Sequence, residues 1–350
     1  MPLSWADRAR ALKSEDGTAV ASTSAAQPSA LPAEPAPPAK ALSSSTPMFP
    51  LPSDEENLEA TRTKWLNIQR KMAPKVIVND EHTPFQLPTH DPTFCRIASN
   101  ADPSWSPPDY SRRSPSLPQL SIIAGIDISF VDGTDLAVAS IAVFSFPEMK
   151  LLGTLMHHCV MQLPYICTFL AFREVPPIEA LLDLLQATQP HLYPQLLFVD
   201  GNGYHHPRHC GVACHLGVVR GIPTIGVAKD LLAVKGLSRE GIADALVAAA
   251  KVGTKIVPLV TAECPLWGHV ALTGNSTKKP IYISPGHMIS FGSAAALTWI
   301  VSKMRIPEPI RQADLLSRAY IKSKLKIDGA DAIAAPGIEV TVGSAAVARK

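Results

Sequence analysis

Three acidic residues stand in stretches of the chain that are otherwise apolar. Asp127 lies inside AGIDISF, Asp200 ends the run LLFVD, and Glu174 ends FLAFRE. An ionised carboxylate in such a setting costs several kcal/mol unless it is paired or bound to a metal. Because Mg²⁺ binds through a few carboxylates and keeps water and substrate phosphate in its shell, the pattern predicts metal-assisted phosphodiester hydrolysis. The alternative for each acid taken alone is a helix cap or a surface ion pair.

The stretch DGNGYHHPRHCGVACH at residues 200–215 gathers imidazoles and thiols. A calcium loop is not supported, because Tyr204 and His205 stand where an oxygen ligand and a turn glycine are needed. A zinc site is a weaker alternative, because the stretch has no CxxC knuckle and no second pair follows it. Its ligands would come from His205, His206, His209, Cys210, Cys214 and His215.

The elements that must position these residues follow from the apolar patterns. Three β-like runs, at residues 120–130, 136–146 and 151–161, predict an antiparallel meander. Helical and strand patterns then alternate, which indicates parallel strands joined by crossover helices. They are a helix at 177–188, a strand at 195–199, a helix at 210–220, a strand at 223–227 and a helix at 239–252. We therefore expect an α/β fold with a ribonuclease H-like mixed sheet, antiparallel meander plus parallel strands, flanked by helices.

Composition divides the 350 residues into four regions. Residues 1–52 are rich in Ala, Ser and Pro and are expected to be disordered. Residues 53–119 hold an amphipathic helix, at 53–72, and a proline-rich irregular connection. The catalytic domain is predicted at 120–326, and residues 327–350 are expected to form a loose tail.

Charge and hydropathy exclude several classes of protein. The net charge of +2 excludes a polycation, and no run of 18 apolar residues is free of charge, which argues against a membrane span. We find no secretory signal pattern, and six cysteines without framework spacing fit a reducing compartment. We expect an intracellular protein of the cytoplasm, the nucleus or both, although an organelle address is not excluded.

The block DGNGYHHPRHCGVACHLG resembles the signature of the endonuclease V family, with a continuation like that of its eukaryotic branch. The resemblance runs in order through GIDISF, LPYICTFLAFRE, IGVAKDLL, YISPGHMIS and RIPEPIRQAD, and covers about residues 120–318. It implies a ribonuclease H-like fold and Mg²⁺-dependent hydrolysis of the second phosphodiester 3′ to inosine, with Mn²⁺ able to substitute. The eukaryote-like block favours inosine in single-stranded RNA over deoxyinosine in DNA.

The resemblance also assigns roles to residues of the site. Asp127 and Asp200 match the metal-binding aspartates, and Glu174 matches the metal-linked glutamate. A further polar position near the metal is matched by Asp314. The histidine and lysine beside the scissile phosphate are matched by His206 and Lys229, whereas His287 has a weaker case and a structural alternative.

The segment LPYICTF resembles the wedge of the family, a short turn whose apolar tip holds strands apart beside the lesion. Tyr165 and Ile166 occupy the wedge positions; the alternative is that they begin a core element. Thr168 stands where the family usually has glycine, and Cys167 where proline or serine is common, which puts the tightness of base recognition in question. Other pocket positions are matched by Leu170, Gly203, Gly211 and Leu232.

A basic segment at residues 303–326 could contact nucleic acid phosphates, although a solvated helix face explains it equally well. Its basic residues are Lys303, Arg305, Arg311, Arg318, Lys322, Lys324 and Lys326. The expected partner is inosine-containing RNA or DNA, no membrane is involved, and the chain is expected to be a monomer. The alternatives are a deoxyinosine DNA-repair endonuclease, a flap or junction nuclease of the same fold, and a catalytically inactive nucleic-acid binding protein.

Overall fold

The structure is a computed structural model, and it describes residues 55–110, 117–161, 163, 165–276, 278–325 and 337–342. The chain divides into two units, 1–51 and 52–350, and the described residues belong to the second. The region 1–52 for which disorder is predicted lies outside the described residues. No helix within the described residues is long and apolar enough to cross a membrane.

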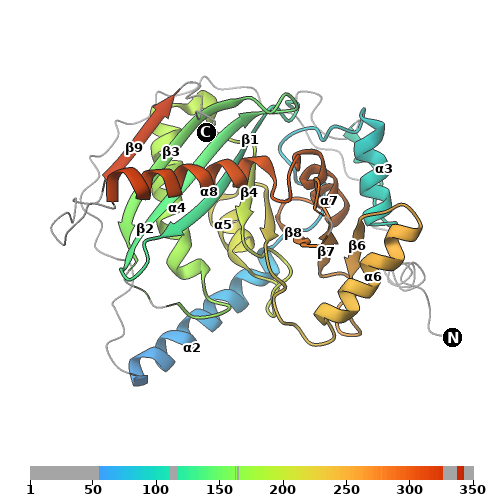
Figure 1. The fold of residues 1–350 in the computed structure, drawn as a ribbon, viewed down its shortest axis with the longest axis horizontal. Helices are drawn as coiled ribbons and strands as arrows, with labels where there is room; N and C mark the ends of the chain where they lie inside the picture. Colours follow the sequence, from blue (N-terminus) through green and yellow to red (C-terminus); the bar gives the residue numbers. More distant parts are fainter. Residues whose placement is uncertain are drawn as a thin grey trace, which may run out of the picture. The chain divides into compact units, whose positions relative to one another are not determined.

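A mixed sheet forms the centre of this unit (Figure 1). Its strands run in the spatial order β6-β7-β8-β5-β4-β1-β2-β3-β9 within the described residues. The central strands β1, β4 and β5 are parallel to one another, and the remaining neighbours pair antiparallel. The predicted ribonuclease H-like mixed sheet is confirmed. The strands are β1 Ile122–Phe130, β2 Leu136–Ser145, β3 Leu151–Val160, β4 Leu196–Asp200, β5 Thr224–Ala228, β6 Ile256–Leu259, β7 Gly268–Ala271, β8 Ile281–His287 and β9 Gly337–Val342.

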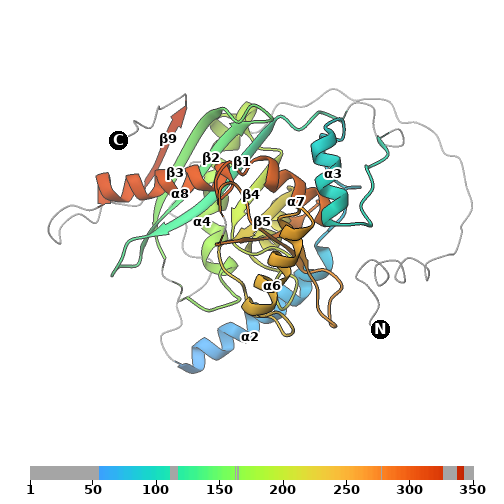
Figure 2. The same cartoon turned by 45° about the vertical axis from the view of Figure 1, so that its right-hand side comes forward.

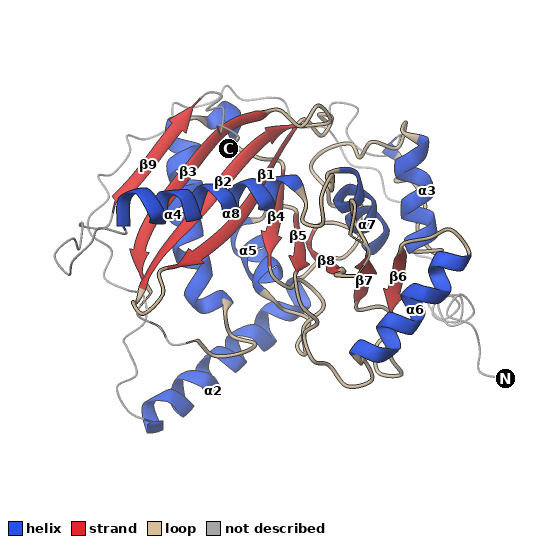
Figure 3. Ribbon diagram, viewed as in Figure 1, coloured by secondary structure: helices blue, strands red, loops and turns tan. Residues whose placement is uncertain are grey.

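Helices cover both faces of the sheet (Figure 3), and the strand period of two distributes side chains between them. Leu196 and Phe198 of β4 belong to one core cluster, and Leu197 and Val199 belong to the other. The first cluster packs under α3, α7 and α8, and the second under α4 and α5. Burial on both faces explains why β4 reads as a continuous apolar run. The helices are α2 Glu55–Met72, α3 Pro92–Ala101, α4 Ala171–Thr188, α5 Val212–Arg220, α6 Arg239–Lys251, α7 Phe291–Ile300 and α8 Glu308–Tyr320.

Several boundaries differ from the sequence prediction. Helix α4 begins at Ala171, six residues before the predicted start, so Glu174 lies in the first turn of a helix. Helix α3 interrupts the stretch expected to be irregular, because the Asp91 side chain caps its first turn and Pro92 suits that turn. Most of the predicted loose tail lies outside the described residues, but β9 falls within it and pairs with β3.

Two helices hold special positions relative to the sheet. Helix α8 crosses β1 and β2 (Figure 1), and the contact is so close that a Cβ on Gly125 would lie 2.0 Å from the carbonyl carbon of Pro309. Helix α2, the predicted N-terminal helix, lies below α4 in the view of Figure 2 and contacts α5. Its Trp65 ring stacks on Phe172 of α4 with a centroid distance of 4.8 Å.

Candidate active site

Two aspartates on neighbouring central strands form the centre of the site. Asp127 lies on β1 and Asp200 ends β4, and the register pairs Ile126 with Val199 immediately before them. The Asp127 side chain is only 4% exposed. Burial raises the pKa of Asp127, and the hydrogen bond and charge of Asp200 raise it further. The predicted neighbourhood of these two carboxylates is therefore observed.

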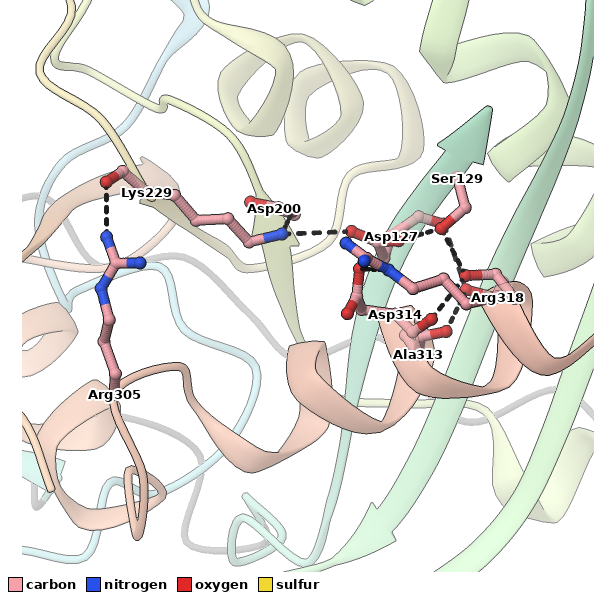
Figure 4. Close-up of polar contacts among 10 residues, drawn as sticks. Asp127, Ser129, Asp200, Lys229, Arg305, Ala313, Asp314 and Arg318 are labelled. Atoms are coloured by element: carbon pink, nitrogen blue, oxygen red, sulfur yellow. Dashed lines mark hydrogen bonds and ion pairs between the residues drawn. The ribbon is translucent and has the colours of Figure 1, made fainter. Parts of the chain in front are cut away.

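Lys229, just after β5, supplies a cation between the two carboxylates (Figure 4). Its Nζ lies 2.5 Å from Oδ2 of Asp200 and 3.8 Å from Oδ1 of Asp127. Burial alone would lower the pKa of Lys229, but the two aspartates raise it above the usual value, so the ammonium is charged. The guanidinium of Arg305 donates to the Lys229 carbonyl at 2.7 Å, which fixes the backbone from which the lysine extends.

Helix α8 adds a third aspartate, Asp314, to the two strand aspartates. Asp314 accepts a hydrogen bond from Arg318 Nε at 2.8 Å. The helix is held on the sheet by Ser140, whose hydroxyl is 2.9 Å from the Ala313 carbonyl and 3.1 Å from the Asp127 carbonyl. These contacts and the close approach at Gly125 place Asp314 beside the two strand aspartates (Figure 4).

Glu174 approaches the same cluster from α4. Burial raises its pKa to about 8, the charge of Asp200 adds to the rise, and Arg173 opposes it. Glu174 does not line the cleft described next, yet its charge acts on Asp200. The charge of Glu174 therefore acts on the site through its electrostatic interaction with Asp200.

An open cleft of about 640 Å³ gives access to the aspartates. Arg318 and Lys322 of the predicted basic segment line it, together with the partly exposed ring of Phe130. Other basic residues of that segment are engaged elsewhere: Arg305 binds backbone carbonyls, and Arg311 forms a bidentate pair with Glu308. The remaining acidic and basic lining residues are Asp127, Asp132, Asp200, Lys229 and Asp314.

The donor set suits a hard divalent cation. Asp127 and Asp200 offer carboxylate oxygens at a buried position that already holds a positive charge, the Lys229 ammonium. In this arrangement no group of three or more His, Cys, Asp or Glu side chains among the described residues is spaced to hold a metal. Two carboxylates nevertheless suffice for Mg²⁺, which keeps several waters. The two aspartates therefore fit Mg²⁺ once the Lys229 ammonium moves away from them. The zinc alternative, which needs three or four such ligands, has no support in the described residues.

His206, which the resemblance places beside the scissile phosphate, contacts the Thr168 carbonyl and the backbone of its own loop. It does not line the cleft as the described residues define it, and its Nε2 lies 3.0 Å from the Thr168 carbonyl while Nδ1 faces the amide of Arg208 at 3.3 Å. The carbonyl can only accept and the amide only donate, so the proton resides on Nε2. Burial lowers the pKa of His206 to about 3, helped by the Arg208 charge. In this structure His206 is a neutral donor to the Thr168 carbonyl.

The predicted wedge projects outward. Tyr165 is 68% exposed and Ile166 is half-buried, which argues against the alternative that they begin a core element. Thr168 adopts φ +67°, the left-handed conformation that favours glycine. The threonine side chain is accommodated in this conformation, and its Oγ1 accepts a hydrogen bond from Arg208 Nη2 at 2.7 Å.

The predicted pocket residues divide into two groups. Leu170 at the start of α4 and Leu232 after Lys229 are half-buried and keep some contact with solvent. The two glycines have a structural reason: a Cβ on Gly203 would lie 2.3 Å from the Pro285 carbonyl oxygen, and one on Gly211 would lie 2.2 Å from that of Asn202. His287 is also structural, since its Nδ1 accepts from the Ile77 amide.

Sequence reasoning missed a residue that holds the segment predicted to be the wedge. Gln69 of α2 is 1% exposed and bonds to both Thr168 and Arg208. Its spacing of four residues from Trp65 places it on the buried face of the helix, and a glutamine at such a position is the signal that could have drawn attention to it.

A ribonuclease H-like sheet with clustered carboxylates on its central strands defines a class of phosphodiester-cleaving nucleases. A family model described as Endonuclease V matches residues 109–315, and the chain belongs to the endonuclease V family. It is 42% identical to mouse Endonuclease V over 215 residues, which is 61% of this chain and 64% of the mouse protein. It is 39% identical to human Endonuclease V over 219 residues, covering 62% and 78% of the two chains.

Solved structures agree with the family assignment. The catalytic domain of human Endonuclease V superposes with a TM-score of 0.63 at 34% identity, over 76% of this chain and 98% of that one. Endonuclease V of Ciona intestinalis, in complex with a 24mer DNA containing an inosine followed by a ribo-adenosine, superposes with a TM-score of 0.62 at 30% identity. That match covers 75% of this chain and 98% of the Ciona chain.

Proposed function

We propose that this chain is a divalent-metal-dependent endonuclease that hydrolyses the second phosphodiester 3′ to inosine. The observation that carries the proposal is the cleft in which Asp127, Asp200 and Asp314 gather around Lys229. Such a group of acids next to a lysine and an open, basic-walled cleft is suited to a phosphate substrate. The inosine in the nucleic acid bound by the Ciona relative supports the choice of base.

Asp127 and Asp200 would hold the cation, with Glu174 acting on it through them. Mg²⁺ is the proposed ion and Mn²⁺ a substitute. When bound, a divalent ion lowers the pKa of a coordinated water and stabilises charge on the phosphate. Both carboxylates would have to be ionised to hold it, and Lys229, once released from Asp200, would be available to contact a phosphate oxygen as a compact point charge.

The cleft walls would hold the strand, and the wedge would expose the base. Arg318 and Lys322 offer cationic groups for backbone phosphates, a contact that gives affinity without sequence choice. The exposed Phe130 ring, with the Arg173 guanidinium 4.5 Å from its centroid, offers a surface on which a base can stack. Tyr165, whose side chain is exposed, would insert between neighbouring bases and so offset part of the cost of unstacking inosine.

Inosine in single-stranded RNA is the proposed natural substrate. The ribo-adenosine that follows inosine in the Ciona complex places a ribose on the 3′ side of the base, as an RNA strand would. We also propose that the chain acts inside the cell, in the cytoplasm or nucleus, which its six free cysteines support.

The test is cleavage of matched single-stranded oligonucleotides, RNA and DNA, each with one inosine or none, in Mg²⁺ and in chelator. Cleavage one nucleotide beyond inosine in RNA, absent in chelator and in Asp127→Ala, is the expected result. Preference for DNA would favour a repair role, and equal cleavage of inosine-free branched DNA would favour a flap or junction nuclease. Nucleic acid binding without any cleavage would contradict an enzymatic function.

A further inference from the structure

Gln69 is a buried amide that connects three segments distant in sequence. Its Nε2 lies 3.0 Å from the Thr168 carbonyl and 3.2 Å from the Cys210 carbonyl, and its Oε1 accepts from Arg208 Nε at 2.6 Å. One side chain of α2 thus satisfies the turn that carries the wedge and the loop that follows Asp200. A buried amide with both ends bonded fixes its partners strongly, because losing either end leaves polar groups unpaired.

The Thr168 carbonyl is the meeting point of these contacts. It also accepts from Arg208 Nη2 at 2.8 Å and lies 3.0 Å from His206 Nε2, so three side chains converge on one oxygen. The residue itself is held at φ +67°, a conformation that costs a non-glycine residue free energy and persists only where its surroundings impose it. The convergent donors impose it, and they set the direction in which the chain before Thr168 leaves the body of the protein.

Aromatic packing makes this arrangement rigid. Trp65, one turn before Gln69, stacks on Phe172, and the Arg208 guanidinium lies 4.5 Å from the centroid of the Phe169 ring. Phe169 and Phe172 are on either side of the start of α4, so the turn is anchored at the point where it enters the helix. In contrast, the tip of the turn is exposed at Tyr165.

We propose that Gln69 is a positioning residue for substrate recognition, which makes α2 part of the apparatus that reads inosine. The inference rests on the proposed function. Gln69 touches neither the acids nor the exposed tip; it holds the Thr168 carbonyl, and through it the orientation of Tyr165 and Ile166. Loosening this contact should therefore impair strand binding and discrimination of inosine from adenosine and leave the metal-dependent step intact.

Two substitutions separate the contacts. Gln69→Met conserves volume and removes every hydrogen bond, whereas Gln69→Glu keeps an acceptor for Arg208 but turns a carboxylate toward the Thr168 and Cys210 carbonyls. Asn67→Ala is the matched control, an exposed residue of the same helix. The assay is cleavage of RNA containing inosine or adenosine, with kcat and KM measured separately and thermal unfolding followed in parallel.

For both Gln69 variants we expect KM for inosine RNA to rise by about tenfold, the inosine preference to fall by a similar factor, and kcat to change less than threefold. Because Gln69 acts through the wedge, Gln69→Met should have little further effect in a Tyr165→Ala background. Unchanged KM and preference, or losses that simply multiply with those of Tyr165→Ala, would overturn the inference alone. If Gln69→Met fails to fold, Gln69→Glu decides on the same criteria. A wild-type protein indifferent to inosine would overturn the proposed function and this inference together.

Discussion

Glu174→Gln tests the electrostatics of the acidic cluster directly. Burial and the charge of Asp200 raise the pKa of Glu174 to about 8 in the folded, metal-free protein, above the ordinary value of 4.5. Between these pH values the native state keeps a proton that the unfolded chain has released. The free energy of unfolding therefore falls as pH rises through this window, and the loss is complete above pH 8.

The magnitude follows from the difference of the two pKa values. At about 1.36 kcal/mol per pKa unit, the ionised Glu174 destabilises the metal-free protein by at most about 5 kcal/mol above pH 8. The side chain retains some contact with solvent, so we expect about half of this, which corresponds to about 5 to 10 °C in Tm for a domain of this size. The glutamine of the variant has a similar shape and no charge, so the variant should escape the loss.

The measurement is thermal unfolding in chelator at pH 5, 7 and 9, for wild type and Glu174→Gln. The two proteins should unfold at similar temperatures at pH 5 and diverge as pH rises, with the variant more stable. Glu308→Gln is the control of opposite sign, because the hydrogen bonds from Arg311 and Gln312 lower the pKa of Glu308 against the effect of burial. Parallel curves for wild type and Glu174→Gln would refute the assignment of Glu174 to the buried acidic cluster.

Three further outcomes are expected. Lys229→Met should bind Mg²⁺ more tightly in calorimetry at pH 8, because the ammonium that competes for the carboxylates is removed, yet it should cleave inosine RNA about 100-fold more slowly. Weaker Mg²⁺ binding by the variant would contradict the role of Lys229 as a competitor for the two aspartates. Gly125→Ala should lower the free energy of unfolding by about 3 kcal/mol or more in urea titrations, because the added Cβ forces α8 to move away from β1. The control Gly133→Ala should cost about 1 kcal/mol, because Gly133 lies in open space at φ +74°. Equal losses for the two variants would count against the close packing of α8 on β1. Burial lowers the pKa of His269 to about 4, so the stability that the neutral imidazole contributes is present above the ordinary pKa of 6.5 and falls by about 3 kcal/mol as pH drops toward 4. His269→Gln should therefore flatten the pH dependence of the free energy of unfolding in urea between pH 7 and 5. An unchanged pH dependence in the variant would exclude this contribution.

Local patterns predicted the part of the site that strand geometry determines. Asp127 and Asp200 each stand in or at the end of a buried apolar strand, and parallel pairing of those strands brings the two carboxylates together. The start of α4 was misplaced because its prolines resemble a first-turn signal, and Glu174 was therefore expected at the end of an apolar run instead of in a helix.

The parts that periodicity could not supply depend on contacts between distant segments. Gln69 and Thr168 are 99 residues apart, and Gln69 and Arg208 are 139 apart, so no local pattern links them. The contact of His206 Nε2 with the Thr168 carbonyl belongs to the same network and joins residues 38 positions apart. The resemblance supplied residue roles, but the hydrogen bonds that give His206 its tautomer and Thr168 its conformation appear only in three dimensions.

The pairing of β9 with β3 has a consequence for how this protein is made. The ladder joins residues 153–158 to residues 337–342, so the last strand of the described chain must arrive before the outer edge of β3 is covered. During synthesis that edge, with its unpaired amides and carbonyls, is available to other chains until residues 337–342 have left the ribosome. Pairing of β9 with β3 is therefore a late, long-range event. A chain truncated before residue 337 would leave the edge of β3 unpaired and able to bind strands of other chains.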